Sequence, residues 1–260
     1  MVDFILLIPC LNNEKGLIDS IKSINYPPKK FKILIVDDGS STPISEIKII
    51  FSNYFIEILR IENNKGILNA LNTGLKHVQE RNLFKYIARL DAGDTCHSDR
   101  FIKQIHFLDN NSEIALLGSW GRFENATKNK KYDYITQTTH DEIVKEMHSK
   151  CSFLHPTVVF RKEIIDTVGF YPGNFPHAED YAYFWEVLKK HKAAVLPELL
   201  VNITVNDKNI SSENYRKQLI SRKRIIKQYS TYGFLKAKGL FLLTWKQLTP
   251  TFLIKWMKFK

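Results

Sequence analysis

Short apolar runs that alternate with helical patterns constrain the fold of this chain more than any other feature of its sequence. Residues 4–8 read FILLI and stop at Pro9, and residues 33–36 read ILIV and stop at an acidic turn. Runs of this length predict strands buried in a parallel sheet. Residues 16–25, between the two runs, carry apolar side chains at helical spacing and precede a Tyr-Pro-Pro stop. This order predicts a βαβ unit.

The alternation of apolar runs and helical patterns continues to about residue 188. We predict further strands at residues 55–61, 86–90, 115–118 and 157–160, and helices at residues 68–78, at 99–108, from 162 onward and at 175–188. The stretch from 125 to 139 is polar and predicts no element. Strands that alternate with helices predict an α/β fold with an open mixed sheet flanked by helices.

Two of the predicted strands end in acidic turns. Asp37 and Asp38 follow the second strand, and Asp91 and Asp94 follow the fourth. A single Asp after a strand is commonly a turn former, but ligands bind at the carboxyl ends of strands in open α/β sheets. Four carboxylates repel one another unless a positive charge lies among them, and a divalent cation that also binds substrate phosphates supplies it. The turns therefore predict a metal-bridged diphosphate.

Other phosphate-binding sequences are absent from the chain. No GxGxxG follows the first strand and no GxxxxGK[ST] occurs anywhere, which argues against a dinucleotide site and a P-loop. Residues 9–14 read PCLNNE instead, and their polar side chains are suited to face a base or a ribose.

Eight short motifs occur in the order seen in glycosyltransferase family 2. They are IP (8–9), NE (13–14), VDDGSS (36–41), NKG (64–66), ALNTG (70–74), ARLDAGD (88–94), HPT (155–157) and AEDY (178–181). From about residue 4 to 211 the chain resembles that family, whose fold is GT-A, a Rossmann-like nucleotide-sugar-binding architecture. The resemblance implies a catalytic domain at residues 1–211, and the remainder, 212–260, is predicted to be a basic amphipathic helical extension.

The resemblance implies a nucleotide-sugar site at the two acidic turns. Asp38, with Asp37 beside it, matches the acid that contacts the nucleoside, usually uridine. Asp91 and Asp94 match the first and last acids of the DxD-type motif, which hold ribose and a Mn or Mg ion on the diphosphate. Gly93 stands where many relatives have a third Asp, so we assign the metal first to Asp94. The other residues assigned to the nucleotide sugar are Pro9, Asn13, Glu14, Lys65, Gly66, Asn72, Arg89 and His155.

The resemblance also implies that Asp180, with Glu179 beside it, is the general base of an inverting enzyme. The chemistry agrees, because a nucleoside diphosphate leaves readily once a cation neutralises its charge, whereas the acceptor hydroxyl must lose a proton. A glycosidase would need two carboxyl groups flanking the bond. Arg89 is predicted either to contact phosphate or to pair with the Asp cluster, and His155 either to approach the diphosphate or to stabilise a turn. Trp185 is either a core residue or a stacking platform for a sugar.

The C-terminal tail carries the net charge of +11. Residues 214–260 contain 12 of the 38 Lys and Arg and no acid, which leaves 26 bases against 27 acids in the body. Two helical stripes follow each other: Tyr215, Leu219, Ile226 and Tyr229, then Phe234, Ala237, Phe241, Trp245 and Leu248. The second stripe either packs on the body or, with the lysines and the aromatics of 251–260, contacts an anionic membrane surface.

Composition narrows the cellular setting. With 44% hydrophobic and 25% charged residues the chain can bury a core, and no apolar run reaches the roughly 18 residues of a membrane span. The acid at position 3 argues against an export signal, and the three dispersed cysteines predict reduced thiols in a cytoplasmic protein.

These features predict a metal-dependent inverting glycosyltransferase. The expected donor is a UDP-sugar carrying glucose, galactose or an N-acetylated relative. The expected acceptor is a saccharide, lipid-linked, at the inner face of the cytoplasmic membrane, for surface polysaccharide (O-antigen or capsule) biosynthesis. One alternative is a sugar-phosphate nucleotidyltransferase, which would need a Gly-rich basic loop after the first strand. The other is a non-catalytic nucleic-acid-binding protein that uses the basic tail. Neither explains Glu179 and Asp180, so we expect no nucleic-acid partner.

Overall fold

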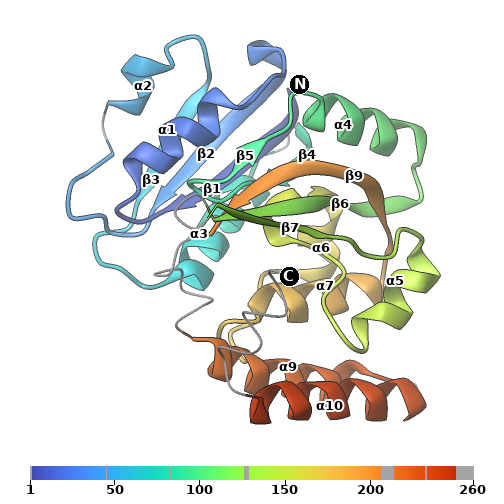
Figure 1. Cartoon of the computed structure of the whole chain (residues 1–260). Helices are drawn as coiled ribbons and strands as arrows, with labels where there is room; N and C mark the ends of the chain where they lie inside the picture. Colours follow the sequence, from blue (N-terminus) through green and yellow to red (C-terminus); the bar gives the residue numbers. More distant parts are fainter. Residues whose placement is uncertain are drawn as a thin grey trace.

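One nine-stranded mixed sheet organises the molecule (Figure 1). The computed structural model describes residues 2–44, 46–81, 84–125, 129–205, 214–231 and 233–249. The strand order is β3-β2-β1-β4-β8-β6-β9-β5, and β7 pairs with β6. The strands are β1 (Val2–Cys10), β2 (Phe31–Asp37), β3 (Ile56–Arg60), β4 (Phe84–Arg89), β5 (Thr95–Cys96), β6 (Ile114–Asn125), β7 (Lys130–Tyr134), β8 (Val159–Arg161) and β9 (Lys192–Thr204). Strands β1 to β4 are parallel, whereas β8 is antiparallel to β4 and β6. The predicted open mixed α/β sheet is confirmed.

Helices cover both faces of this sheet. They are α1 (Glu14–Lys22), α2 (Ile47–Ile50), α3 (Ile67–Gln79), α4 (Arg100–Asn110), α5 (His140–Met147), α6 (Glu163–Val168), α7 (Glu179–Leu188), α9 (Tyr215–Tyr229) and α10 (Gly233–Leu248). Because side chains alternate along a strand, Ile5 and Leu7 of β1 join the core under α3 and α7, while Phe4, Leu6 and Ile8 join the core under α1 and α4. The apolar run of β1 is therefore buried on both faces.

Strand β1 continues past the residue that we predicted to stop it. Pro9 pairs with Val36, and the strand ends one residue later at Cys10. Pairing of β1 with β4 extends only to Leu7, so at Pro9 the strand has a partner on one side and the missing proline N–H breaks no ladder. The carboxyl ends of β1 and β2 therefore lie side by side.

The second half of the sheet contains elements that the sequence patterns did not predict. Strand β9 was not predicted, yet it runs parallel to β6 over most of its length, with register shifts. Strand β7 lies within the polar stretch 125–139, and α5 follows it. Strand β6 itself extends to Asn125, beyond the predicted 115–118. In Figure 1, β6 and β9 are the long curved strands that cross the centre of the molecule.

Helices α9 and α10 lie side by side at the end of the molecule farthest from α2 (Figure 1). Helix α9 adds Ile225 and Tyr229 to the core that contains α7, and Leu243 of α10 packs on Leu219 and Ile226 of α9. At Gly239, a Cβ atom would come within 1.8 Å of the His148 carbonyl oxygen, so α10 also approaches the body closely.

The apolar stripe predicted for α10 faces solvent. Phe234 and Leu248 are each 80% exposed, Phe241 is 71% exposed and Trp245 is 48% exposed. On another side of the helix, Gln247 accepts a hydrogen bond from Lys223 of α9. The helix was predicted correctly, and of the two alternatives for its stripe, packing on the body is not observed. The boundary at 211/212 and the segment 251–260 lie outside the described residues. In the part of the chain that the structure describes, no helix is both long and apolar enough to span a membrane.

Candidate active site

The turn after β2 neutralises its first acid with an arginine. Asp37 is buried, and its Oδ2 lies 2.5 Å from the guanidinium of Arg60, which ends β3. Its Oδ1 accepts the backbone N–H of Ser40, and Arg60 also donates to the Ser40 carbonyl. Both oxygens of Asp37 thus have partners, one in the turn and one at the end of β3, and the residue supports the loop.

The second acid of this turn, Asp38, ties two loops together. Its carboxylate accepts the backbone N–H of Lys65 at 3.1 Å, and its own N–H donates to the Cys10 carbonyl at 2.9 Å. Gly39 has φ +79°, and a Cβ atom there would lie 2.6 Å from the backbone nitrogen of Asn64. Only glycine fits this close approach without strain. Gly66, with φ +86°, is the N-cap of α3, and the Lys65 side chain beside it is exposed.

Two consecutive asparagines connect the acidic turns. The Asn12 side chain accepts the N–H and the hydroxyl of Ser41, in the turn after β2, at 2.8 and 2.9 Å. The Asn13 side chain donates to the carbonyl of Ala92, in the turn after β4, at 2.7 Å, and accepts the N–H of Gly16 at the start of α1. Because adjacent Cα atoms are about 3.8 Å apart, both turns lie within reach of one short segment. The structure therefore brings the two acidic turns together.

Three hydrogen bonds hold the turn after β4, one from α1 and two from the end of β9. The hydroxyl of Ser20 in α1 accepts the N–H of Gly93, the Thr204 N–H at the end of β9 donates to Asp94 Oδ1 at 3.0 Å, and the Thr204 hydroxyl donates to the Gly93 carbonyl. Gly93 has φ +106°, and a Cβ atom there would lie 3.2 Å from the Asn13 amide. An Asp at this position would be strained, which explains in physical terms why the motif reads DAGD here.

Asp91 and Asp94 differ in charge balance. Asp91 Oδ1 lies 2.7 Å from the guanidinium of Arg89, whereas Asp94 is buried. Burial, and then the Asp91 charge, raise the pKa of Asp94 well above its ordinary value, against the opposing effects of the Thr204 N–H, Arg100 and Arg89. Asp94 is thus a buried carboxylate whose ionised form lacks sufficient compensation from the protein.

This donor set fits a hard divalent ion that is shared with a ligand. A cation beside Asp94 would relieve the penalty of ionising it, and carboxylate oxygens are the ligands that Mg and Mn prefer. Among the described residues, no three His, Cys, Asp or Glu side chains gather into a preformed metal site. Asp94 and Asp91 would therefore hold the ion together with oxygens that the protein does not supply, such as those of a diphosphate.

Arg89 and His155 form a buried layer behind the acidic turn. The Arg89 guanidinium is fully buried and donates to the Leu7 carbonyl, to Asp91 and to Nε2 of His155, the last at 3.3 Å. Of the two predicted roles of Arg89, the ion pair is present. His155 lies in a short 3₁₀ turn (His155–Thr157), and its Nε2 also contacts the Tyr171 hydroxyl at 2.8 Å. Burial, and then Arg89, lower the pKa of His155 well below its ordinary value, so the ring is neutral.

The acid predicted to be the general base and the acid beside it begin helix α7. Glu179 and Asp180 are its first two residues, and the Asp180 carboxylate accepts the backbone N–H of Tyr181. Burial, and then Asp180, raise the pKa of Glu179 to about 7. Burial also raises the pKa of Asp180, although Arg222 of α9 and the Tyr181 N–H oppose the shift. Asp91 raises the pKa of both acids, which brings the α7 acids and the β4 turn into one electrostatic neighbourhood.

The other predicted site residues differ in their surroundings. Asn72 of α3 exchanges two hydrogen bonds with the backbone of Tyr171, each 2.9 Å long, so it tethers the segment before α7. Pro9 lies in β1 and Glu14 begins α1, both at the edge where the acidic turns lie. Trp185 is buried in the core and stacks on Tyr229. Its core role is confirmed.

Three functional supports were missed by sequence reasoning. Thr204 holds the Asp94 turn from β9, which local periodicity did not predict. The buried Arg100 of α4 donates to the Arg89 carbonyl at 2.7 Å, and its position after an Asp gave no signal beyond a helix start. Arg222 lies in the tail, whose basic side chains were predicted to face solvent or an anionic membrane surface.

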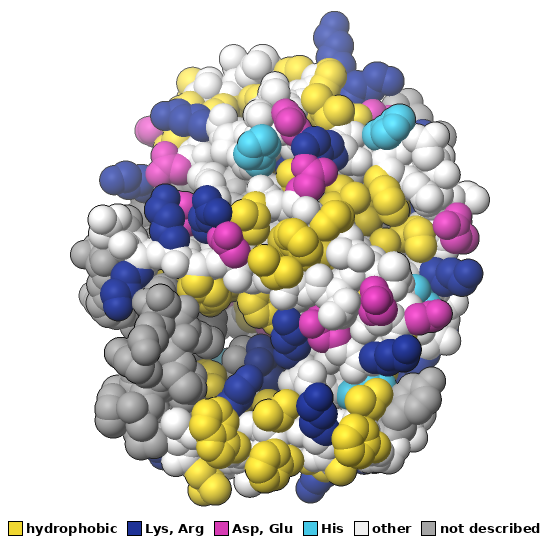
Figure 2. All heavy atoms as spheres, turned by 45° about the vertical axis from the view of Figure 1, so that its right-hand side comes forward, with side chains coloured by type: hydrophobic (Ala, Val, Ile, Leu, Met, Phe, Trp, Pro, Cys, Tyr) yellow, Lys and Arg dark blue, Asp and Glu magenta, His cyan; other side chains and the backbone are white. Residues whose placement is uncertain are grey.

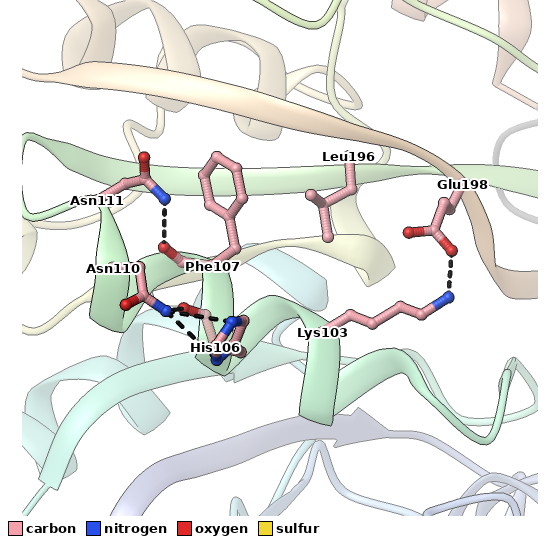
Figure 3. Close-up of a pocket in the computed structure, with 7 residues that line it drawn as sticks. All are labelled: Lys103, His106, Phe107, Asn110, Asn111, Leu196 and Glu198. Carbon is pink, nitrogen blue, oxygen red and sulfur yellow. Dashed lines mark hydrogen bonds and ion pairs between the residues drawn. The ribbon is translucent and has the colours of Figure 1, made fainter.

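A separate cavity of about 420 Å³ lies between α4 and β9 (Figure 3). Its seven lining residues are Lys103, His106, Phe107, Asn110, Asn111, Leu196 and Glu198. The residues come from the two sides of a shallow opening, and Lys103 pairs with Glu198 across it. None of them is a predicted site residue, so this cavity is distinct from the acidic edge.

The fold and the acidic edge together are typical of a glycosyltransferase of the GT-A type. Residues 5–169 match the model of the family described as "Glycosyl transferase family 2", which is more than half of the chain. The chain therefore belongs to glycosyltransferase family 2, and it is a glycosyltransferase.

Relatives and solved structures agree with this family. The chain is 28% identical to the amylovoran biosynthesis glycosyltransferase AmsE of Erwinia amylovora, over 98% of this chain and 97% of that protein. It is 29% identical to an uncharacterized glycosyltransferase of Haemophilus influenzae, over 86% and 84% of the two chains.

Two solved structures share the GT-A fold at low sequence identity. S. aureus TarS in complex with UDP-GlcNAc matches with a TM-score of 0.69 at 17% identity, over 93% of this chain and 72% of that one. The mannosyltransferase PcManGT from Pyrobaculum calidifontis, solved with GDP-Man and Mn²⁺, matches with a TM-score of 0.63 at 12% identity, over 94% and 68%.

Proposed function

We propose that this glycosyltransferase inverts configuration while it transfers a hexose from a UDP-sugar to a saccharide acceptor, with Asp180 as general base. The observation that carries the proposal is the contrast between the acids at one sheet edge. Arginines neutralise Asp37 and Asp91, whereas burial raises the pKa of Asp180 and of Glu179. Neutralised acids support a binding loop, and an acid with a raised pKa is suited to accept a proton.

The donor would bind where the loops after β1, β2 and β4 meet. Asp38 and the polar segment 12–13 would contact the nucleoside, and residues 91–94 would contact the ribose and diphosphate. Support for uridine comes from the similar fold of TarS, which was solved with UDP-GlcNAc. Mn or Mg, held by Asp94 with Asp91, would supply positive charge to the departing diphosphate. The similar fold of PcManGT, solved with Mn²⁺, supports a divalent cation.

The transfer step would be a single displacement. The acceptor hydroxyl gives its proton to the Asp180 carboxylate while its oxygen forms a bond to the anomeric carbon. The bond from that carbon to the diphosphate oxygen breaks at the same time, and its electron pair leaves with UDP. Attack opposite the leaving group inverts the anomeric centre. A base of this kind contributes about 10²- to 10⁴-fold in rate.

The acceptor would be a growing surface polysaccharide, such as an O-antigen or a capsule chain, linked to lipid at the inner face of the cytoplasmic membrane. The similarity to AmsE, named for amylovoran biosynthesis, supports a polysaccharide pathway. The exposed stripe of α10 supports a peripheral membrane contact, because its apolar side chains lie among lysines and arginines on a helix pair that has no acid from residue 214 onward. Figure 2 shows apolar and basic side chains together along the lower edge, where Figure 1 places α9 and α10.

A thermal-shift screen with nucleotide sugars tests the donor and the ion. A ligand that binds only the folded protein raises its melting temperature by mass action. We expect UDP-hexoses with Mn or Mg to stabilise the chain, EDTA to remove the effect, and GDP-mannose to give a smaller shift. If no uridine compound stabilised the protein with either ion, the donor assignment would be rejected. Release of UDP in the presence of a saccharide acceptor then tests the transfer itself.

A further inference from the structure

The segment just before the proposed base is short and has no regular structure of its own. Phe175 is anchored in the core, and Asp180 follows five residues later. His177 between them has φ +63°, in the left-handed region that non-glycine residues rarely adopt. A backbone in this conformation persists only when its surroundings hold it. The position of Asp180 therefore depends on what fixes residues 176–178.

Helix α9 fixes this segment by two side-chain hydrogen bonds. The Gln218 side-chain amide donates to the carbonyl of His177 at 2.9 Å, and the Ser221 hydroxyl donates to the carbonyl of Pro176 at 2.7 Å. Residues three apart on a helix share one face, so both bonds come from one turn of α9. The two carbonyls belong to the peptide units on either side of His177, two and three residues before α7 begins.

Apolar contacts hold the same face of α9 against α7. Tyr229 stacks on Trp185 of α7 with ring centroids 6.2 Å apart, and it also lies beside Phe175. Ile225 is fully buried in the core that contains α7. Residues 218, 221, 225 and 229 follow a helical stripe, so α9 is fixed in rotation as well as in position.

Arg222 lies on this stripe and brings a positive charge near Asp180. Its Nε is buried and finds no hydrogen-bond partner among the described residues. Its charge lowers the pKa of Asp180, against burial and against Asp91 of the β4 turn. The other titratable groups around Asp180 are Glu179 on α7 itself, Tyr171, and Cys151 after α5. Burial raises the pKa of both Tyr171 and Cys151, so neither supplies charge near neutral pH.

We propose that α9 is a positioning element of the active site: Gln218 and Ser221 fix the backbone that aims Asp180, and the buried guanidinium of Arg222 brings a positive charge to the same face of the helix. This inference rests on the proposed role of Asp180 as base. The three side chains act through Asp180 and are positioning residues. The basic tail thus has a second role, on the side of the helix pair that faces away from the exposed stripe of α10.

The test of the hydrogen bonds compares two glutamines on one helix. Gln218→Ala combined with Ser221→Ala is expected to lower kcat at least tenfold. The KM for the UDP-sugar should stay within about twofold of the wild-type value. The UDP-induced rise in melting temperature should stay within about 1 °C of that of the wild type. Gln228→Ala, at an exposed position of α9, is the matched control and should leave kcat unchanged. The single variant Ser221→Thr, which leaves Gln218 unchanged, keeps the hydroxyl and should therefore keep the wild-type kcat. An unchanged kcat in the double variant would overturn the proposal.

The test of Arg222 is a pH profile. Because its positive charge lowers the pKa of the base, Arg222→Gln should move the acidic limb of kcat/KM to higher pH, and Arg222→Lys should restore most of that shift. An acidic limb that stays in place in Arg222→Gln would remove this residue from the proposal. Asp180→Asn is measured beside these variants. Full turnover in Asp180→Asn would reject the proposed base, whereas inactive Asp180→Asn with normal α9 variants would reject only the role of α9.

Discussion

Two groups of acids in this enzyme differ in how their charge is compensated. We call the turns after β2 and β4 the donor edge, and the start of α7, with Glu179 and Asp180, the α7 edge. At the donor edge, Asp37 and Asp91 each face an arginine, and Asp38 accepts a backbone N–H. At the α7 edge, burial raises the pKa of Glu179 and Asp180 despite their place in the first turn of a helix and despite Arg222. The comparison teaches that one fold can hold acids in two states: it compensates the acids of the two turns and leaves those of α7 undercompensated, as the proposed role of Asp180 as base requires.

Asp94 breaks this division, since it lies at the donor edge yet has a raised pKa. Asp94 is buried like the α7 acids, but it belongs to the same DAGD turn as Asp91. A bound cation would bring it into line with its neighbours. The following predictions separate the three kinds of acid, beginning with the largest effect.

Removing the proposed base should have the largest effect on transfer. Asp180→Asn keeps the size of the side chain but cannot take a proton, so we expect kcat to fall by about 10²- to 10⁴-fold. Binding of UDP, measured by thermal shift or calorimetry, should remain normal. The exposed Asp19→Asn on α1 is the control. A variant that retained wild-type turnover would assign the base elsewhere.

Asp94→Asn should separate the proposed metal site from the base. We expect kcat/KM to fall by about 100-fold, because loss of a single second-shell partner of a metal already costs about 10- to 100-fold. The Mn-dependent rise in melting temperature with UDP-sugar should disappear, while the protein without metal is at least as stable as the wild type, since an undercompensated charge has been removed. Persistent Mn-dependent stabilisation would show that Asp94 is not required for the ion.

The exposed stripe of α10 should affect membrane binding without affecting either edge. Phe241→Ser with Trp245→Ser is expected to reduce binding to anionic vesicles about tenfold, because two apolar anchors are lost from a basic surface. Activity on a soluble acceptor analogue should be retained. Ile49→Ser, which changes a residue 78% exposed on α2, should bind vesicles normally. Equal vesicle binding by both variants would exclude the stripe as the contact.

The smallest effect concerns stability as a function of pH. The folded protein holds the pKa of Glu179 at about 7, above the 4.5 of an unperturbed glutamate, so ionising Glu179 disfavours the folded state. The free energy of unfolding should therefore decrease as pH rises from about 4.5 through about 7.

Glu179→Gln removes this loss. In metal-free buffer it should raise the free energy of unfolding at pH 8 by about 1–3 kcal/mol, since one pKa unit corresponds to about 1.4 kcal/mol. At pH 4.5 the difference should nearly vanish. Chemical denaturation at both pH values measures it, with the exposed Glu163→Gln as control. A gain in stability that did not depend on pH would contradict this account of Glu179.

The parallel half of the sheet was predictable because its signals are local. The apolar runs of β1 and β2 and the helical spacing of α1 and α3 each specify an element within about ten residues. The acidic turns could be placed together because parallel strands end at one edge. Family resemblance supplied the candidate residues, but Asn72 shows that a motif position can also be a backbone tether, here for Tyr171.

The second half depends on contacts between distant parts of the chain. Pro197 and Glu198 divide the apolar residues of β9 into two short pieces, so no single apolar run marks it as a buried strand, and its pairing with β6 spans some eighty residues. The packing face of α10 could not be read from its aromatic stripe, because the helix meets α9 through Leu243 and through a close approach at Gly239. The hydrogen bonds of Gln218 and Ser221 join segments about forty residues apart.

The two hydrogen bonds from Thr204 to the DAGD turn have a consequence for the order of assembly during synthesis. Both acids of that turn leave the ribosome more than a hundred residues before the threonine that holds them. A nascent chain can therefore build the first four parallel strands while its DAGD turn still lacks these hydrogen bonds. The turn is completed only when the last long strand of the sheet is in place, so a chain truncated before residue 204 would have the parallel strands without the finished turn that we propose for the donor.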